Sequence, residues 1–158
     1  MKRVVPKSIV LITVVLVAAG ASYPVWADGP AETAEIAAPS GQTLDPTETL
    51  ILFYSDACPH CHNQLRWMER VKEEFPNIPF ETFEIQVTEN AENQEYFAAV
   101  MDAYESNTRG WPRTVIGDRV FIGFDPGDGP LEYNDQYEAW IGYRNQLFDA
   151  LIELQQAP

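Results

Sequence analysis

The chain has 158 residues, with 24 Asp and Glu against 10 Lys and Arg, and a formal net charge of −14 at pH 7. Such an acidic protein is unsuited to binding nucleic acids or anionic membrane surfaces, because both attract positive charge. Its length fits one domain with a modest hydrophobic core.

The first 27 residues have the pattern of a secretory signal peptide. Three basic residues occur before position 8, residues 8–27 carry no charge, and Val25 and Ala27 are small residues at positions −3 and −1 of a cleavage site. The alternative is an uncleaved membrane anchor through residues 8–27, because about 20 apolar residues span a bilayer. Either arrangement exports the domain to the periplasm or an equivalent compartment such as the thylakoid lumen, where thiols can be oxidised.

The rest of the chain divides into a linker and a folded domain. Residues 28–47 are rich in Pro, Ala, Thr and Glu without apolar periodicity, so we expect a flexible linker. Loss of residues 1–27 would leave seven Lys and Arg against all 24 acidic residues, a net charge of about −17. Residues 48–158 are expected to form the folded domain.

Apolar patterns predict the elements of this domain in chain order. The run at residues 50–54 predicts a buried strand, and Pro59 suits the first position of a helix because its missing N–H would be unpaired there. Gly117-Asp118 predicts a two-residue hairpin turn. The predicted order is strand 50–54, a helix from 59 to about 75, strand 80–87, helix 92–105, strands 113–116 and 119–122, and helix 135–154.

Cys58 and Cys61 are the only cysteines in the chain, and they fall where the first strand meets the first helix. This CxxC pair at a helix N-terminus is the arrangement that dithiol redox chemistry needs. Cys58 is predicted as the nucleophile, because the helix N-terminus stabilises a thiolate. Cys61 is predicted as the buried resolving thiol. His60 is expected to favour the thiolate of Cys58 as a nearby donor or positive charge.

The element order and two motifs resemble the thioredoxin superfamily, closest to its glutaredoxin-like form. The motifs are FYSDACPHC at residues 53–61 and GWPRTVIGDRV at residues 110–120. The resemblance implies an α/β fold, a four-stranded mixed sheet flanked by three helices. It also implies a cis Pro112 beside the cysteines and a redox-active disulfide between Cys58 and Cys61. Trp111, Pro112 and Pro59 would form the edge that faces an extended substrate strand.

The resemblance also suggests which kind of oxidoreductase this is. Pro59-His60 is the dipeptide of the DsbA-type periplasmic disulfide oxidases, which predicts an oxidant or isomerase more than a strong reductant. Two positions of this chain depart from the pattern of the resembled families. Leu52 occupies the position of the buried thioredoxin aspartate, and Ile122-Gly123-Phe124-Asp125 replaces the glutathione-binding Gly-Gly-x-Asp turn. We expect protein thiols and disulfides as substrates, a membrane protein as redox partner, a monomer, and no cofactor or metal.

Other functions fit the same residues. Cys58 to His62 also satisfies the C-x-x-C-H signal for covalent haem, with His62 as axial ligand and Met68 or Met101 as the second ligand. A thioredoxin-like binding or redox-sensing module without catalysis would instead have a buried or slow Cys58. The acidic loop at residues 125–129 hints at calcium, but its spacing does not match the EF-hand pattern.

Overall fold

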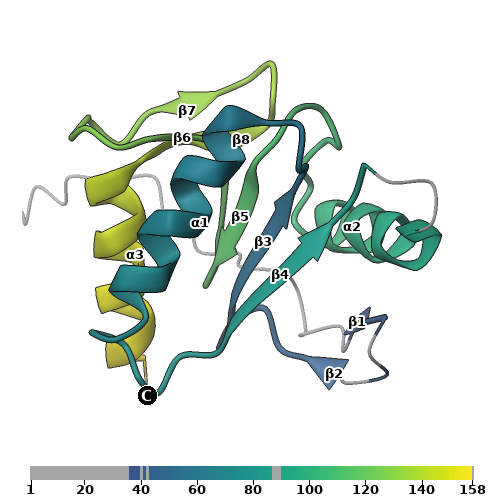
Figure 1. Cartoon of the computed structure of the whole chain (residues 1–158), viewed down its shortest axis with the longest axis horizontal. Helices are drawn as coiled ribbons and strands as arrows, with labels where there is room; N and C mark the ends of the chain where they lie inside the picture. Colours follow the sequence, from purple (N-terminus) through teal and green to yellow (C-terminus); the bar gives the residue numbers. More distant parts are fainter. Residues whose placement is uncertain (1–35, 40, 42, 87–89, 158) are drawn as a thin grey trace, which may run out of the picture.

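The structure is a computed structural model that describes residues 36–39, 41, 43–86 and 90–157. Three layers are visible in Figure 1, with a twisted sheet between helices. The helices α1 (Pro59–Val71) and α3 (Arg144–Gln156) cover one face of the sheet, and α2 (Ala91–Ala103) covers the other. The chain is therefore an α/β protein, as its sequence predicts.

In the part of the chain that the structure describes, six strands form the central mixed sheet, so the expected number of four is wrong. The spatial order is β4-β3-β5-β6-β8-β7. The pairs β3–β4 and β6–β8 are parallel, and β3–β5, β5–β6 and β7–β8 are antiparallel. The strands are β3 (Leu50–Tyr54), β4 (Phe80–Glu84), β5 (Arg113–Ile116), β6 (Arg119–Asp125), β7 (Tyr133–Asn134) and β8 (Ala139–Tyr143).

The central strand β3 separates two apolar clusters because its side chains alternate between the faces of the sheet. Ile51 and Phe53 pack toward α2, and Leu50 and Leu52 pack toward α1 and α3. All four side chains are fully buried. An unbroken apolar run therefore marks a strand that is covered on both sides, as expected for a three-layer fold.

The C-terminal third of the domain differs from its predicted structure. A single helix was expected over residues 135–154, but β7 and β8 occupy residues 133–143 and α3 begins only at Arg144. The side chains of Tyr137, Trp140 and Ile141 have helical spacing, yet the backbone of β8 pairs with β6 on one side and β7 on the other. Gly142 permits this pairing, since a Cβ atom there would collide with the carbonyl oxygen of Gly123.

The other elements agree with the prediction to within a few residues. The parallel pair β3–β4 and the hairpin β5–β6 are confirmed, with Gly117 at φ +60° in the turn. The strand β4 ends at Glu84 rather than at position 87, and β6 continues to Asp125 instead of ending at 122. Ile85 is buried just beyond the end of β4.

Part of the segment expected as a linker is folded against the domain. Residues Ile36–Ala37 (β1) and Thr43–Leu44 (β2) form a separate antiparallel pair, and Ala38 and Leu44 are buried in the cluster that contains α2. The predicted signal peptide at residues 1–27 and the start of the linker lie outside the described residues.

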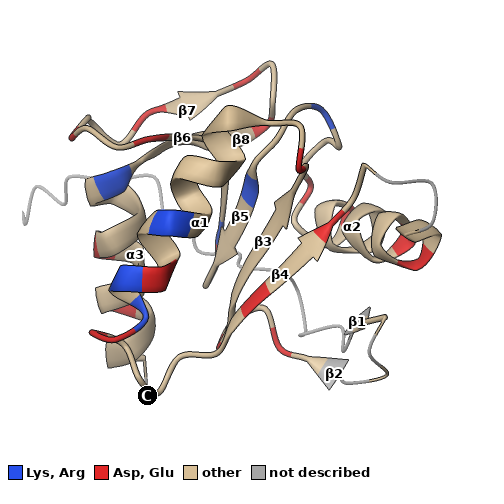
Figure 2. Cartoon of the chain, viewed as in Figure 1, with Lys and Arg blue, Asp and Glu red and all other residues tan. Residues whose placement is uncertain are grey.

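Charge is unevenly distributed over the described surface. Figure 2 shows acidic positions on loops, strands and helices alike, whereas basic positions are few and several lie on or beside α1. Within the described ranges, none of the helices is both long enough and apolar enough to cross a membrane.

Candidate functional site

Cys58 caps the N-terminus of α1. Its backbone is extended, at φ −100° and ψ 115°, and its Sγ accepts a hydrogen bond from the backbone N–H of Cys61 at 3.4 Å. Pro59 follows at the first helical position and is exposed. The Cys58 side chain is partly exposed. Its sulfur therefore lies at the positive end of the helix, within reach of solvent, as a thiolate nucleophile requires.

Cys61 lies one turn further into α1 and is fully buried. Burial, reinforced by its hydrogen bond with Cys58, raises the pKa of the Cys61 thiol to about 12. Near neutral pH this group is therefore protonated. The two cysteines thus differ in exposure in the way that their predicted roles require, with Cys58 accessible and Cys61 shielded.

The loop before β5 brings a second predicted pair of residues to the cysteines. The Trp111–Pro112 peptide bond is cis, as the resemblance implies. The Cys58 thiol donates to the Trp111 carbonyl oxygen, with the sulfur 3.8 Å from it. Trp111 is 37% exposed, and Pro112 is buried with its carbonyl oxygen accepting from Gly123 N–H at 2.9 Å. Residues about 50 positions apart therefore meet at one end of the sheet.

The two histidines near the cysteines have different hydrogen-bond partners. His60 Nδ1 donates to the carbonyl oxygen of Phe124 in β6 at 3.2 Å, because a carbonyl can only accept. The pairing of β6 with β8 shifts register between Ile122 and Asp125, beside this carbonyl. His62 Nε2 donates to the Asp56 carbonyl oxygen at 2.6 Å. The His60 ring is thus anchored on β6 through Nδ1.

The contacts of His62 bear on the haem alternative. Its Nε2 is engaged with Asp56, so axial ligation through this atom would require that bond to break. Met68 and Met101 are buried in separate apolar clusters on opposite faces of the sheet. Within the described ranges, no group of three or more His, Cys, Asp or Glu side chains is placed to hold a metal ion.

Several residues that shape the site were not identified from the sequence. Ser55 is fully buried before the cysteines; its hydroxyl donates to Gln86 Oε1 and accepts from Ala57 N–H at 3.2 Å. Beside Trp111, Ile85 and Phe97 line a shallow hollow. A Ser directly after a strand carries no distinguishing sequence signal, because its partner Gln86 lies 31 positions away.

The buried space between α1 and the central strands contains neutral polar side chains as well as apolar ones. Leu52, at the position of the thioredoxin aspartate, is fully buried. Its cross-strand partner Thr114 accepts a hydrogen bond from Gln64 Nε2 at 2.6 Å, and Gln64 is one turn beyond Cys61 on α1. A neutral amide–hydroxyl pair therefore occupies the buried space between α1 and the central strands.

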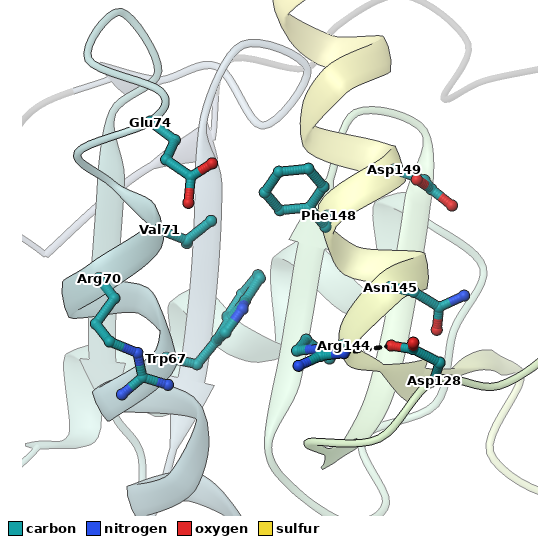
Figure 3. A pocket seen from close by; sticks show the side chains of 9 residues that line it. All are labelled: Trp67, Arg70, Val71, Glu74, Asp128, Arg144, Asn145, Phe148 and Asp149. Atoms are coloured by element: carbon teal, nitrogen blue, oxygen red, sulfur yellow. Dashed lines mark hydrogen bonds and ion pairs between the residues drawn. The ribbon is translucent and has the colours of Figure 1, made fainter.

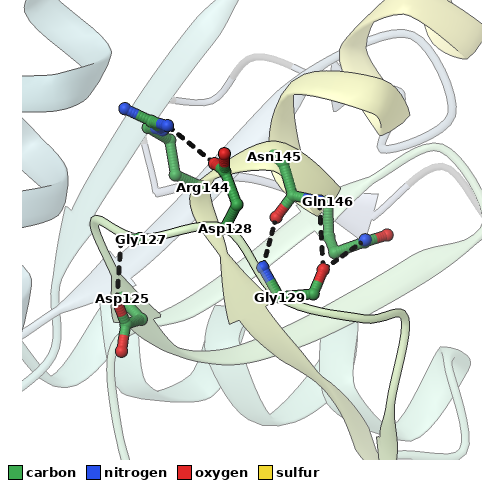
Figure 4. Close-up of polar contacts among 7 residues, drawn as sticks. All are labelled: Asp125, Gly127, Asp128, Gly129, Arg144, Asn145 and Gln146. Atoms are coloured by element: carbon green, nitrogen blue, oxygen red, sulfur yellow. Dashed lines mark hydrogen bonds and ion pairs between the residues drawn. The ribbon is translucent and has the colours of Figure 1, made fainter.

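Two further surface features contain none of the predicted site residues. A hollow between α1 and α3 has an apolar wall of Trp67, Val71 and Phe148, flanked by charged side chains (Figure 3). The acidic loop after β6 is fastened to the start of α3 (Figure 4), where Asp128 pairs with Arg144 at 2.6 Å. The carboxylates of this loop thus have partners within the protein.

The remaining contacts of the acidic loop are hydrogen bonds. Gly129 N–H donates to Asn145 Oδ1 at 2.9 Å, and the Gly129 carbonyl oxygen accepts from Asn145 Nδ2 at 3.0 Å and Gln146 Nε2 at 2.8 Å. Gly127 N–H donates to Asp125 Oδ1 at 2.7 Å. The loop is a fixed connection between β6 and the β7–β8 extension.

Comparison with known proteins adds no assignment to this geometry. No protein-family model matches the chain, and no curated protein or solved structure is significantly similar to it.

Proposed function

We propose that the protein is an extracytoplasmic thiol–disulfide oxidoreductase with a thioredoxin-like fold, acting on protein thiols and disulfides through Cys58 and Cys61. The observation that carries the proposal is the position of Cys58 Sγ. It lies at the N-cap of α1 and 3.8 Å from the Trp111 carbonyl oxygen, beside the cis Trp111–Pro112 bond. The order β3-α1-β4-α2-β5-β6-α3, with β7 and β8 inserted before α3, supports the fold assignment.

The proposed reaction transfers two electrons and two protons between the protein dithiol and a substrate disulfide. The Cys58 thiolate attacks one substrate sulfur, which forms a mixed disulfide and releases the other substrate sulfur as a thiolate that takes up a proton. Cys61 then attacks Cys58 Sγ, and its proton passes to the second departing substrate thiolate. The products are a Cys58–Cys61 disulfide and a substrate dithiol, and the reverse sequence oxidises a substrate.

The unequal environments of the two cysteines support these roles. An exposed nucleophile at a helix N-terminus reacts first, because the unpaired N–H groups stabilise its anion. Cys61, with its pKa raised to about 12 by burial, stays protonated and unreactive toward external reagents until Cys58 carries the substrate. Partial exposure of Cys58 argues against a passive module with an inaccessible thiol.

The test is a redox titration of the purified protein in glutathione buffers, with free thiols alkylated and counted by intact mass. The expected result is a single two-thiol transition, at roughly −120 to −180 mV for a disulfide donor or isomerase, whereas a reductant would lie near −270 mV. Cys58→Ser should abolish disulfide exchange because the attacking sulfur is lost, and retained exchange would contradict the proposal. A haem-sized mass on thiols that resist alkylation would favour the cytochrome alternative.

A further inference from the structure

Arg113 is a charged side chain with no access to solvent. It is the first residue of β5, directly after Pro112, and it is the largest fully buried side chain among the described residues. Burial lowers the pKa of its guanidinium to about 10. A buried cation is costly unless its donors are satisfied, so the partners of this group indicate what it holds in place.

Among the described residues, the hydrogen bonds of the Arg113 guanidinium go to two segments, the loop that leads to the Trp111–Pro112 bond and the β7–β8 turn. In the loop before β5 it donates to Ser106 Oγ at 3.0 Å, to Asn107 Oδ1 at 3.0 Å, and to the Arg109 carbonyl oxygen at 2.6 and 3.2 Å. In the β7–β8 turn it donates to the Tyr137 carbonyl oxygen at 2.9 Å. One planar side chain thus joins both segments.

The same two segments are also joined directly. The Ser106 hydroxyl donates to the Glu138 carbonyl oxygen at 2.7 Å, and Asn107 Nδ2 donates to the Gln136 carbonyl oxygen at 3.1 Å. Gly110 has φ +72°, and a Cβ atom there would lie 3.3 Å from the Tyr137 ring. The loop that ends at Trp111 therefore packs closely on the β7–β8 turn, with Arg113 at the centre of the contact.

The loop held by this network ends at Trp111, the residue that faces Cys58. The Trp111 carbonyl oxygen accepts from the Cys58 thiol, and the exposed Trp111 side chain borders the hollow with Ile85 and Phe97. An extended polypeptide bound beside Cys58 would meet this backbone and this side chain, whereas a small disulfide has no backbone to pair with them.

We propose that Arg113 is a positioning residue that fixes the Trp111 backbone and side chain opposite Cys58, so that the site binds disulfides carried by an extended polypeptide. This inference rests on the proposed oxidoreductase function and deepens it by assigning the substrate class to the Arg113 network. The electron and proton transfers are those of the exchange described above, and Arg113 takes no part in them.

The experiment compares two substrates in the full chain. One is bis(2-hydroxyethyl) disulfide, and the other is a flexible peptide of about ten residues with one disulfide to a small thiol. In Arg113→Met, kcat/KM for the peptide should fall at least about tenfold, mainly through KM, because misplacement by about 1 Å is enough to lose such factors. The rate with the small disulfide should stay within about twofold of wild type. Arg113→Lys, which keeps the charge without the planar fork, should restore the peptide rate only in part.

Val115→Ala is the matched control for lost stability. Val115 is fully buried on the same strand and lies in the cluster that contains α2 rather than in the polar network, so its ratio of peptide to small-disulfide rates should equal that of wild type. An Arg113→Met ratio equal to that of Val115→Ala would overturn the proposal and leave Arg113 as a support of the fold alone.

Each of the remaining outcomes either supports or contradicts the role proposed for Arg113. If Arg113→Met does not fold, Asn107→Ala removes one guanidinium acceptor and the contact with Gln136, and it should shift the ratio in the same direction by a smaller factor. An unchanged ratio in that variant would overturn the proposal. A wild-type protein that exchanges neither disulfide would refute the oxidoreductase function itself, whereas an active wild type with unchanged ratios refutes only the role of Arg113.

Discussion

The two halves of the candidate site differ in what fixes their backbones. In the helix half, residues 55–62, the backbone is fixed mainly by local hydrogen bonds, such as Cys58 N–H to the Ser55 carbonyl and His62 Nε2 to the Asp56 carbonyl, and only the side chains of Ser55 and His60 reach distant partners. In the loop half, residues 106–112, the backbone is fixed by Arg113 and by contacts to residues 136–138, up to 32 positions away.

The difference implies that a mutation can impair one half of the site without impairing the other. A change within residues 55–62 should alter the chemistry of the thiols, since local hydrogen bonds and the helix N-terminus determine their environment. A change in the β7–β8 turn or in Arg113 should alter what is presented to the thiols and leave their reactivity toward small reagents nearly unchanged. The predictions below test this separation, and the Arg113 experiment tests it from the loop half.

The largest expected effect within the helix half comes from Cys61→Ser. Cys58 keeps its position at the N-cap, so the first exchange should proceed, but the mixed disulfide should accumulate because no second thiol can resolve it. Intact-mass analysis under non-reducing conditions should show nearly all of the protein carrying one substrate adduct.

The control for this trap is the double variant Cys58→Ser, Cys61→Ser, which should carry no adduct. Efficient turnover by Cys61→Ser without an accumulated adduct would contradict the resolving role of Cys61. The double variant Arg113→Met, Cys61→Ser should reach the same final extent of trapping as Cys61→Ser, but more slowly with the peptide, because the loop half is expected to affect only the rate and affinity of the first step.

A smaller effect is expected from alkaline pH. Burial raises the pKa of Cys61 to about 12, above its ordinary value of 9.0, so the folded reduced protein holds this proton more tightly than the unfolded chain does. The stabilisation linked to Cys61 is therefore complete below about pH 9 and is lost as the pH rises from about 9 to about 12. Urea unfolding of the reduced protein at several pH values measures it.

Cys61→Ser is the reference for this measurement, because it lacks the titrating thiol and keeps every other group. The free energy of unfolding of wild type minus that of Cys61→Ser should decrease across the same pH window. Parallel curves for the two proteins would mean that Cys61 is less shielded than its full burial indicates.

The smallest effect should come from His60→Ala. His60 belongs to the helix half but is anchored on β6 through Phe124, so it is one of the few links between local and distant parts of the site. Loss of its donor should slow the reaction of Cys58 with iodoacetamide near neutral pH by less than about tenfold, because the contribution of one exposed group is screened by solvent. His62→Ala is the matched control. Equal alkylation rates in the two variants would mean that His60 has no specific effect on Cys58.

The same distinction explains how much could be predicted from sequence. The strand β3, the start of α1 at Pro59 and the hairpin turn at Gly117-Asp118 are encoded by neighbouring residues, and they form as expected. Tyr137, Trp140 and Ile141 fit both a helix and a strand, and the pairing of β8 between β6 and β7 decides between them. No local sequence pattern distinguishes the helix from the strand here.

The residues of the site also differ in whether local motifs could predict them. Cys58, Cys61 and the cis bond before Pro112 follow from motifs, whereas the role of Arg113 does not, because arginine side chains are mostly exposed. Its burial depends on oxygen acceptors supplied by Ser106, Asn107 and Tyr137. The predicted flexible linker likewise missed the burial of Ala38 and Leu44, since Leu44 stands between polar residues and Ala38 ends a run of only three apolar residues.

The paired strands β1 and β2 show at which end of the sheet the described chain begins. They lie at the end of the sheet where β3 begins, at the lower right of Figure 1, while α1 starts at the opposite end. The strand β3 runs from this end of the sheet to the end where α1 starts. The first described strands therefore lie at the end of the domain away from Cys58. A partner joined before Ile36 would therefore meet the domain at the end of the sheet away from Cys58, and the end that carries the proposed nucleophile would stay open to substrates.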